Sequence, residues 1–202
     1  MSDLQRLLQR IDDAGVPFVL VGGYAAMLHG SSLLTRDVDV CAVLTPANIG
    51  KLRDAFRELH PVHRLSSPQR SFLEVPDAAV ALDNLYLNTD LGTLDVLGSI
   101  TGVGDYERVA RDAVDVDLFG RRVRAISVDD LIAAKEALGR DKDLIAAKEL
   151  RACLLRDAVG MDICLTPDSR TAADRGDEGP CAQDSDDGLD EAINAREYAL
   201  EG

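Results

Sequence analysis

The sequence predicts an α/β fold, in the α+β sense: a small mixed twisted sheet flanked by helices, a helical C-terminal subregion and a disordered acidic tail. In residues 1–126, short apolar runs of strand type alternate with stretches of helical apolar spacing. Residues 127–165 hold two helical stretches with no strand between them. Residues 166–202 have few large apolar side chains and many Asp, Gly and Ser, so they cannot bury enough surface to offset the entropy of ordering. We expect the domain boundaries at these positions.

The first predicted elements are a helix and a buried strand. The helix covers residues 3–14, where leucines and an isoleucine recur at helical spacing, and Gly15 suits the position just after a helix. Residues 18–21 (Phe-Val-Leu-Val) form a short, fully apolar run typical of a buried strand. The paired glycines Gly22 and Gly23 end that run, so a sharp turn is expected there.

The next elements are a short helix, a second strand and a longer helix. Residues 24–29 are alanine-rich and stop at Gly30, which leaves room for one or two helical turns. Polar and apolar residues alternate in residues 37–43, as in a strand. Thr45 and Pro46 are good N-cap and N1 residues for the longer helix. The apolar residues of that helix share one face: Ile49, Leu52, Phe56 and Leu59.

The second half is predicted to contain two antiparallel strand pairs followed by two helices. The pairs are residues 84–89 with 93–98, across Asp90-Leu91-Gly92, and residues 114–119 with 122–126, across Gly120. Ser127 begins a capping box with Asp130 that opens a helix through Leu138. After Gly139, a further helical stretch runs to about residue 159.

Composition excludes several classes of function. The chain has 202 residues with a net charge of −14, and more than half of that excess lies in residues 168–202. No run of about eighteen apolar residues exists that could span a bilayer, so no membrane partner is expected. The acidic balance argues against a broad nucleic-acid-binding surface. The four cysteines form no CxxC pair and follow no signal peptide, which is typical of reduced thiols in a cytoplasmic protein.

Residues 19–40 carry the most informative pattern: a strand, the glycine pair, a short helix and a strand with two aspartates. Gly22 and Gly23 let the backbone turn sharply and approach a ligand, and the N–H groups of the following helix can bind anionic oxygens. Asp37 and Asp39 are two residues apart on the predicted strand, which puts both carboxylates on one face with Cα atoms roughly 6.6 Å apart. The pattern predicts a phosphate site beside a cation site.

Magnesium fits such a site because it prefers oxygen ligands and bridges one or two carboxylates to substrate phosphates. Two such ions about 4 Å apart can stabilise the attacking and leaving oxygens of an in-line displacement. A third carboxylate is expected, and Asp95 is the best candidate because it lies in an otherwise apolar strand, where an unpaired charge is costly. Asp83 and Asp90 are its rivals. We therefore predict a two-metal Mg²⁺ site made by Asp37, Asp39 and Asp95.

Other chemistry-bearing residues receive simpler interpretations. Asp115 and Asp117 form a second Asp-Val-Asp, but no strand–glycine–helix unit precedes them, so we assign them to an exposed edge strand. His29 is expected to satisfy backbone carbonyls at the end of its short helix. His60 and His63 have no metal-binding spacing with other histidines.

The Gly-Gly pair, thirteen intervening residues, Asp-Val-Asp and a later strand aspartate resemble the nucleotidyltransferase superfamily of the DNA polymerase β type. In particular, the sequence is similar to the small bacterial minimal nucleotidyltransferases and the AbiEii-like toxin group, over about residues 4–150. The family more often has Gly-Ser than Gly-Gly at the turn, so one hydroxyl contact to phosphate is missing here. The resemblance implies that residues 1–126 are a nucleotidyltransferase-like core that uses an NTP.

The resemblance also implies roles for individual residues. Gly22 and Gly23 would hold the triphosphate. Asp37 and Asp39 would bind Mg²⁺. Asp95 would act as third ligand or help to deprotonate the acceptor.

Four further residues are candidates for nucleotide binding. Thr35 and Arg36 directly precede the aspartates, and Arg36 could steady a phosphate or balance the local negative charge. Residues 133–143 resemble the helical segment that follows the catalytic sheet in the family. There Lys135 or Lys142 could approach the nucleotide, or either could be a solvated helix residue.

The function predicted from these features is Mg²⁺-dependent transfer of a nucleoside monophosphate from an NTP to an acceptor hydroxyl, with release of pyrophosphate. The acceptor could be a protein side chain, an RNA 3′ end or a small molecule such as an aminoglycoside. The family's association with toxin–antitoxin and phage-defence pairs makes a partner protein reasonable, by analogy of fold. Two alternatives stay open: a catalytically silent module that binds a protein partner, and hydrolysis of a phosphate ester at the same carboxylates.

Overall fold

The structure is a computed structural model that describes residues 2–74 and 81–158, all within one compact unit. Its helices are α1 (Asp3–Asp13), α2 (Gly22–Leu28), α3 (Pro46–Phe56), the 3-10 turn η1 (Arg57–Leu59), α4 (Tyr106–Asp112), α5 (Val128–Leu138) and α6 (Asp141–Ala158). Its strands are β1 (Phe18–Leu20), β2 (Val38–Ala42), β3 (Val62–His63), β4 (Asn84–Thr89), β5 (Gly92–Leu97), β6 (Ser99–Ile100), β7 (Gly104–Asp105), β8 (Val114–Leu118) and β9 (Arg121–Ala125). The tail predicted over residues 166–202 lies outside the described residues.

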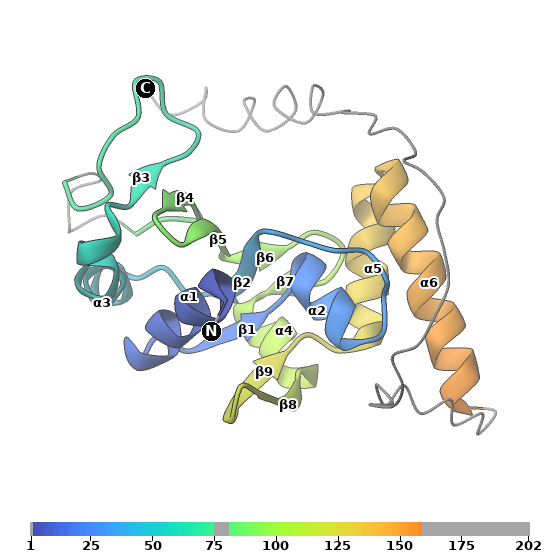
Figure 1. The fold of residues 1–202 in the computed structure, drawn as a ribbon. Coiled ribbons are helices and arrows are strands. Elements are labelled where there is room, and N and C mark those ends of the chain that lie inside the picture. The colour runs from blue at the N-terminus through green and yellow to red at the C-terminus, as the bar shows by residue number, and fades with distance from the viewer. Residues whose placement is uncertain (1, 75–80, 159–202) are drawn as a thin grey trace, which may run out of the picture. The chain divides into compact units, whose positions relative to one another are not determined.

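Seven strands form one mixed sheet in the order β3-β4-β5-β2-β1-β9-β8 (Figure 1). The pairs β2–β5 and β1–β9 are parallel, and the other neighbours are antiparallel. Strands β6 and β7 form a separate small hairpin. The mixed sheet flanked by helices confirms the predicted fold class.

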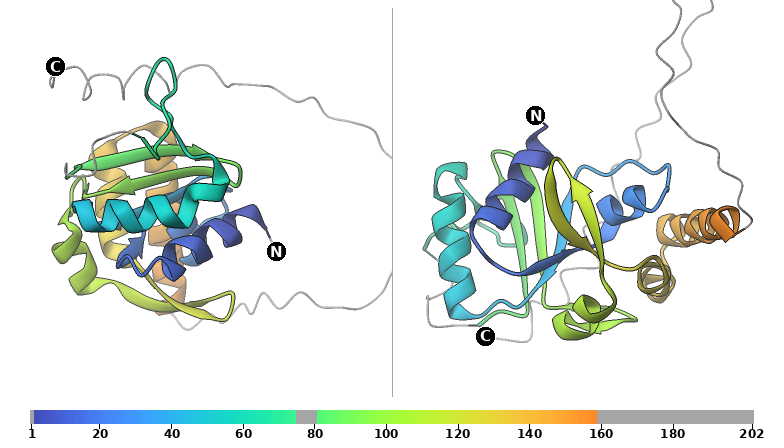
Figure 2. Two further views of the ribbon diagram at one scale, coloured as in Figure 1. Left: turned by 90° about the vertical axis from the view of Figure 1, so that its left-hand side faces the viewer. Right: turned by 90° about the horizontal axis from the view of Figure 1, so that it is seen from below.

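The helices pack on both faces of the sheet, which lies between them in the right-hand view of Figure 2. One apolar cluster joins α1 and α3 to the side chains of Val38 and Val40 on β2. The other joins α2, α4 and α5 to the opposite face, where Cys41 lies. Because side chains alternate along a strand, Asp39 shares the face of Cys41. This face carries the site.

The helix starts follow the predicted capping chemistry. The hydroxyl of Thr45 accepts the backbone N–H of Asn48 at 3.2 Å, at the start of α3. Ser127 accepts the N–H of Asp130 at 3.3 Å at the start of α5, but the Asp130 carboxylate accepts from Arg108 at 2.9 and 3.0 Å instead of closing the predicted capping box. Gly139 ends α5 in the left-handed conformation, with φ of 67°. None of the described helices is long and apolar enough to cross a membrane.

Three features differ from the sequence-based expectations. First, α2 begins at Gly22 itself, so the glycine pair is the first turn of the helix. Second, β2 is buried on both faces although its sequence alternates, because it lies between β1 and β5 under two helical layers. Third, β3, the β6–β7 hairpin and α4 were not predicted, since the three strands have two residues each and α4 has only seven.

Candidate functional site

Asp39 and Asp95 lie side by side on neighbouring parallel strands. They are register partners across β2 and β5, and Tyr86 of β4 is the register partner of Asp95 on the other side. Residues opposite each other on neighbouring strands point to the same face. The two carboxylates therefore share the face that α2 and α5 cover near the centre of the sheet (Figure 1).

The glycine pair packs directly against this face. Gly22 has φ of 63°, and a Cβ there would lie 2.6 Å from Cγ of Asp39. A Cβ on Gly23 would lie 2.8 Å from Cβ of Thr35. The backbone N–H of Gly23 donates to the Asp39 carboxylate. In the structure these glycines allow the close approach of Asp39 and Thr35, and their approach to a ligand stays a prediction.

Asp37 lies one residue before β2, in an exposed position, and not on the strand where the sequence placed it. Its backbone N–H donates to Oγ1 of Thr35 at 3.3 Å, which ties the end of the preceding loop together. The negative charge of Asp37 raises the pKa of both Asp39 and Asp95, so all three carboxylates lie within electrostatic reach of one another. The structure thus brings together the three predicted acidic residues, which we call the aspartate trio.

Two members of the aspartate trio, Asp39 and Asp95, are costly to ionise in their surroundings. Burial, with the charges of Asp95 and Asp37, raises the pKa of Asp39 from 3.8 to about 6, against the hydrogen bond from Gly23 and the charge of Lys135. Burial also raises the pKa of Asp95, against a hydrogen bond and charge from Arg64. Groups with raised pKa values are stabilised when an additional cation lowers the cost of their charge. A cation-binding role fits this arrangement.

Arg64, directly after β3, is the site residue that sequence reasoning missed. Its Nη2 donates to both oxygens of Asp95, at 2.7 and 2.6 Å, and its guanidinium carbon lies 5.6 Å from the centre of the Tyr86 ring. No motif marks Arg64, because β3 is only two residues long. One signal was available in the sequence: Asp95 lies in an apolar strand, where an unpaired charge is costly, so a cationic partner was to be expected.

Lys135 reaches the site from α5. Its charge lowers the pKa of Asp39, and its Nζ donates to Oδ1 of Asp143 at 2.7 Å. Asp143 is fully buried and also accepts from Nε of Arg140 at 2.6 Å. This places Lys135 near the aspartate trio with its ammonium already oriented. Lys142 is an exposed residue of α6, and its nucleotide contact stays a prediction.

The remaining candidates have ordinary surroundings. Arg36 is exposed in the loop before β2. Nε2 of His29 lies 2.8 Å from the carbonyl oxygen of Ile126, just after β9, and not against the carbonyls at the end of its own helix as predicted. Asp90 pairs with Nδ1 of His60 at 2.7 Å.

The second Asp-Val-Asp provides an internal comparison. It lies on β8, at the edge of the seven-stranded sheet, and both of its aspartates, Asp115 and Asp117, are exposed. The structure confirms the predicted exposed edge strand.

The donor set of the trio suits magnesium only in part. Within residues 2–74 and 81–158, no three His, Cys, Asp or Glu side chains are arranged to hold a metal ion. Arg64 occupies both oxygens of Asp95. Asp37 and Asp39 remain, and two carboxylates are a sufficient protein contribution for Mg²⁺ when substrate phosphates and water supply the other ligands. The role of Asp95 as a third ligand stays a prediction.

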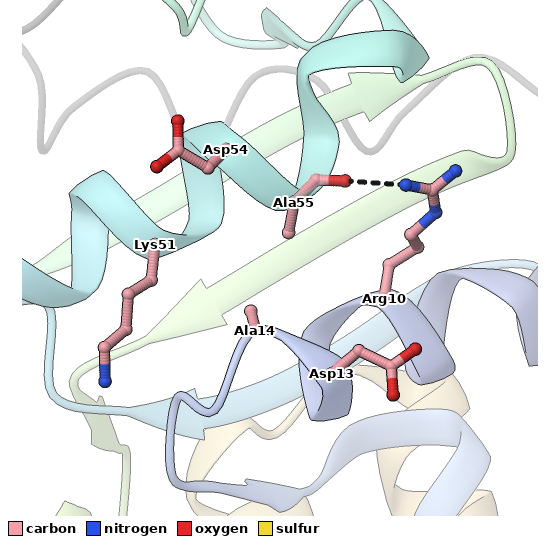
Figure 3. Close-up of a pocket in the computed structure, with 6 residues that line it drawn as sticks. All are labelled: Arg10, Asp13, Ala14, Lys51, Asp54 and Ala55. Carbon is pink, nitrogen blue, oxygen red and sulfur yellow. Dashed lines mark hydrogen bonds between the residues drawn. The ribbon is translucent and has the colours of Figure 1, made fainter.

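A pocket between α1 and α3 lies on the other face of the sheet and does not belong to this site (Figure 3). Its lining residues are Arg10, Asp13, Ala14, Lys51, Asp54 and Ala55. Nη1 of Arg10 donates to the carbonyl oxygen of Ala55 at 3.4 Å across it (Figure 3).

Comparison with known proteins identifies the fold. A scan of protein-family models finds no match, and no curated protein matches. Among solved structures, the lincosamide antibiotic adenylyltransferase LnuA, solved with lincomycin bound, is 16% identical over 75% of this chain and 96% of that chain, with a TM-score of 0.51. A proposed nucleotidyltransferase from Thermotoga maritima is 20% identical over 75% and 92%, with a TM-score of 0.47. The likeness to LnuA shows that this chain shares the fold of that structure.

Proposed function

We propose that this protein is a Mg²⁺-dependent nucleotidyltransferase. The oxygen of an acceptor hydroxyl forms a bond to the α-phosphorus of an NTP, the bond between the α-phosphorus and the bridging oxygen breaks, and pyrophosphate leaves. The observation that carries the proposal is the pair Asp39 and Asp95 on one sheet face, with Asp39 packed against Gly22 at the start of α2 and Asp37 within electrostatic reach. In this fold, that combination favours phosphoryl chemistry over a role in packing.

Asp37 and Asp39 are the residues that would hold the divalent cation. Bound there, the cation would neutralise charge on the triphosphate and on the leaving pyrophosphate. Asp39 is suited to this because burial and like charges raise its pKa to about 6, which leaves it ionised at neutral pH but at an energetic cost. Asp37 contributes a second, exposed carboxylate at the entrance of β2.

Lys135 would bind and orient the triphosphate. Its side chain is only 15% exposed, and Asp143 fixes the ammonium group within electrostatic reach of Asp39. A lysine held in this way presents its charge without first losing rotamer freedom. Asp95 would complete the cation's ligands or accept the proton of the acceptor hydroxyl.

A small molecule with a free hydroxyl is the acceptor class to test first, with ATP as donor. The name of LnuA describes it as an adenylyltransferase of lincosamide antibiotics, and this chain covers nearly all of that structure's length. The net charge of −14 also favours acceptors that carry positive charge, because an acidic protein attracts cations from solution. A protein acceptor in a toxin–antitoxin pair stays a prediction from the motif resemblance.

The first test is label transfer. We expect the purified protein, incubated with Mg²⁺, each α-labelled NTP in turn and separate pools of small molecules, RNA and protein, to move the label to an acceptor in one pool. Chromatography and mass spectrometry then identify the product, which gains the mass of one nucleoside monophosphate. Release of labelled monophosphate without a labelled acceptor in any pool would instead indicate hydrolysis, and would contradict the proposal.

A further inference from the structure

We propose that Arg64 is a positioning residue that competes with the divalent cation for Asp95, so that Asp95 joins the cation site only when the arginine releases it. The inference rests on the proposed function and deepens it, because it assigns to one residue the control of the third carboxylate. It also accounts for the finding that the described residues contain no ready three-ligand metal site although three aspartates lie together.

The topology places Arg64 for this role. Four residues form a row across neighbouring strands on the site face: Arg64, Tyr86, Asp95 and Asp39. The row is built by strand pairing, since Asp95 is the register partner of Tyr86 on one side and of Asp39 on the other. The backbone N–H of Arg64 donates to the carbonyl oxygen of Tyr86 at 3.0 Å, which fixes the start of its side chain. The arginine therefore reaches Asp95 along the sheet surface.

The Arg64–Asp95 ion pair does not have the bidentate geometry that gives the strongest arginine–carboxylate pairs. In a bidentate pair, two guanidinium nitrogens each bind one carboxylate oxygen. Here Nη2 alone binds both oxygens, and Nε is buried with no hydrogen-bond partner in the described part of the chain. The Arg64 side chain is 30% exposed. Because Arg64 leaves one buried donor unused and its side chain reaches solvent, a divalent cation that binds Asp95 more strongly can displace it.

Charge balance gives the same result. Lys135 is already held by Asp143, which is fully buried. Arg64 directly offsets the charge of Asp95, one of three carboxylates that repel one another. A divalent cation carries twice the charge of the guanidinium and seeks the same oxygens, so the two compete for Asp95. In this structure Asp95 is bound to Arg64.

The test measures cation affinity without nucleotide. Mn²⁺ serves as a paramagnetic probe, and the free-ion signal in electron paramagnetic resonance gives the dissociation constant. The measurement is made at mildly alkaline pH, above the pKa of about 6 of Asp39. We expect Arg64→Gln to bind Mn²⁺ roughly tenfold more tightly than the unmodified protein, the size expected when a charged hydrogen-bond competitor is removed. Arg64→Lys keeps the charge and should stay close to the unmodified protein.

The matched control is Arg53→Gln. Arg53 also lies over an aromatic ring, 5.3 Å from the centre of Phe72, and its Nε donates to the Phe72 carbonyl oxygen at 2.8 Å, but it belongs to α3 on the other face. Its replacement should leave Mn²⁺ affinity unchanged. Adding Asp95→Asn to Arg64→Gln should abolish the gain, because Asp95 is the ligand that Arg64 withholds.

Circular dichroism identifies the variants that retain the fold. If Arg64→Gln does not fold, Arg64→Met supplies a second neutral replacement. Unchanged or weaker Mn²⁺ affinity in a folded neutral variant would overturn the inference, as would a gain that persists with Asn at position 95. If the unmodified protein transfers label but the gain is missing, the inference fails and the proposed function stands. If no protein in the series binds Mn²⁺ or transfers label, the proposed function fails as well.

Discussion

Replacing Asp39 with asparagine is expected to lower nucleotidyl transfer by about a thousandfold or more, because the site loses the carboxylate at the centre of its electrostatic stabilisation. Asp37→Asn should have an effect of similar direction and size. Asparagine keeps the shape of the side chain, so the fold should remain. Initial rates of label transfer from α-labelled NTP at saturating Mg²⁺ measure the effect.

The same Asp39→Asn change should make the cation-free protein more stable at neutral pH. The folded state raises the pKa of Asp39 from 3.8 to about 6. Folded protein therefore binds more protons than unfolded protein between these values, and its stability falls as pH rises through about 6. The shift corresponds to at most about 3 kcal/mol, which asparagine would recover above pH 6 and not near pH 4. Denaturant melts at both pH values, with a metal chelator present, check this sign.

The second Asp-Val-Asp supplies the control for this experiment. Asp115→Asn and Asp117→Asn change the same residue types in the same tripeptide on the exposed edge strand β8. Both variants should have the same transfer rate and the same denaturant melt as the unmodified protein. Undiminished transfer by both Asp37→Asn and Asp39→Asn would refute the assignment of the site.

Gly22→Ala is expected to destabilise the protein and to abolish most of its activity together. The residue has φ of 63°, and an added Cβ would lie within 2.7 Å of Cβ and Cγ of Asp39. Backbone strain and steric overlap together should cost about 2–5 kcal/mol. Displacement of Asp39 from its position should lower transfer by a further factor of about a hundred in the protein that remains folded.

Gly15→Ala separates these two effects. Gly15 has nearly the same backbone conformation, with φ of 62°, but a Cβ there meets nothing within 4 Å. It should cost about 1–2 kcal/mol in denaturant melts from backbone strain alone and leave the transfer rate of folded protein unchanged. Equal losses of activity in the two variants would show that Gly22 has no special relation to Asp39.

Much of the site could be read from the sequence because its geometry is local. Asp37 and Asp39 are two residues apart, and the glycine pair follows β1 after a single residue, so these groups lie close along the chain even though Asp37 precedes β2. Asp95 was identified by the cost of its charge in an apolar strand. The tight turn at Asp90-Leu91-Gly92 then fixed its hairpin, which the structure confirms.

The rest depends on long-range packing that local patterns do not encode. Arg64 meets Asp95 only after β3 adds to the edge of β4, a pairing of two residues. The burial of β2 on both faces follows from its central place in the sheet. Asp143 faces Lys135 because α6 folds back along α5 after Gly139. In each case the partner is distant in sequence or belongs to an element too short to leave a periodic signal.

We infer that Asp37 and Asp39 hold a divalent cation together with the phosphates of a nucleotide beside Gly22 and Gly23. Calorimetric titration of the unmodified protein with ATP, GTP, CTP and UTP, with Mg²⁺ and with a chelator in its place, tests it most directly. We expect that at least one nucleotide binds, that binding requires Mg²⁺, and that Asp39→Asn removes it. Binding of equal strength without Mg²⁺, or no binding of any nucleotide by folded protein, would contradict it.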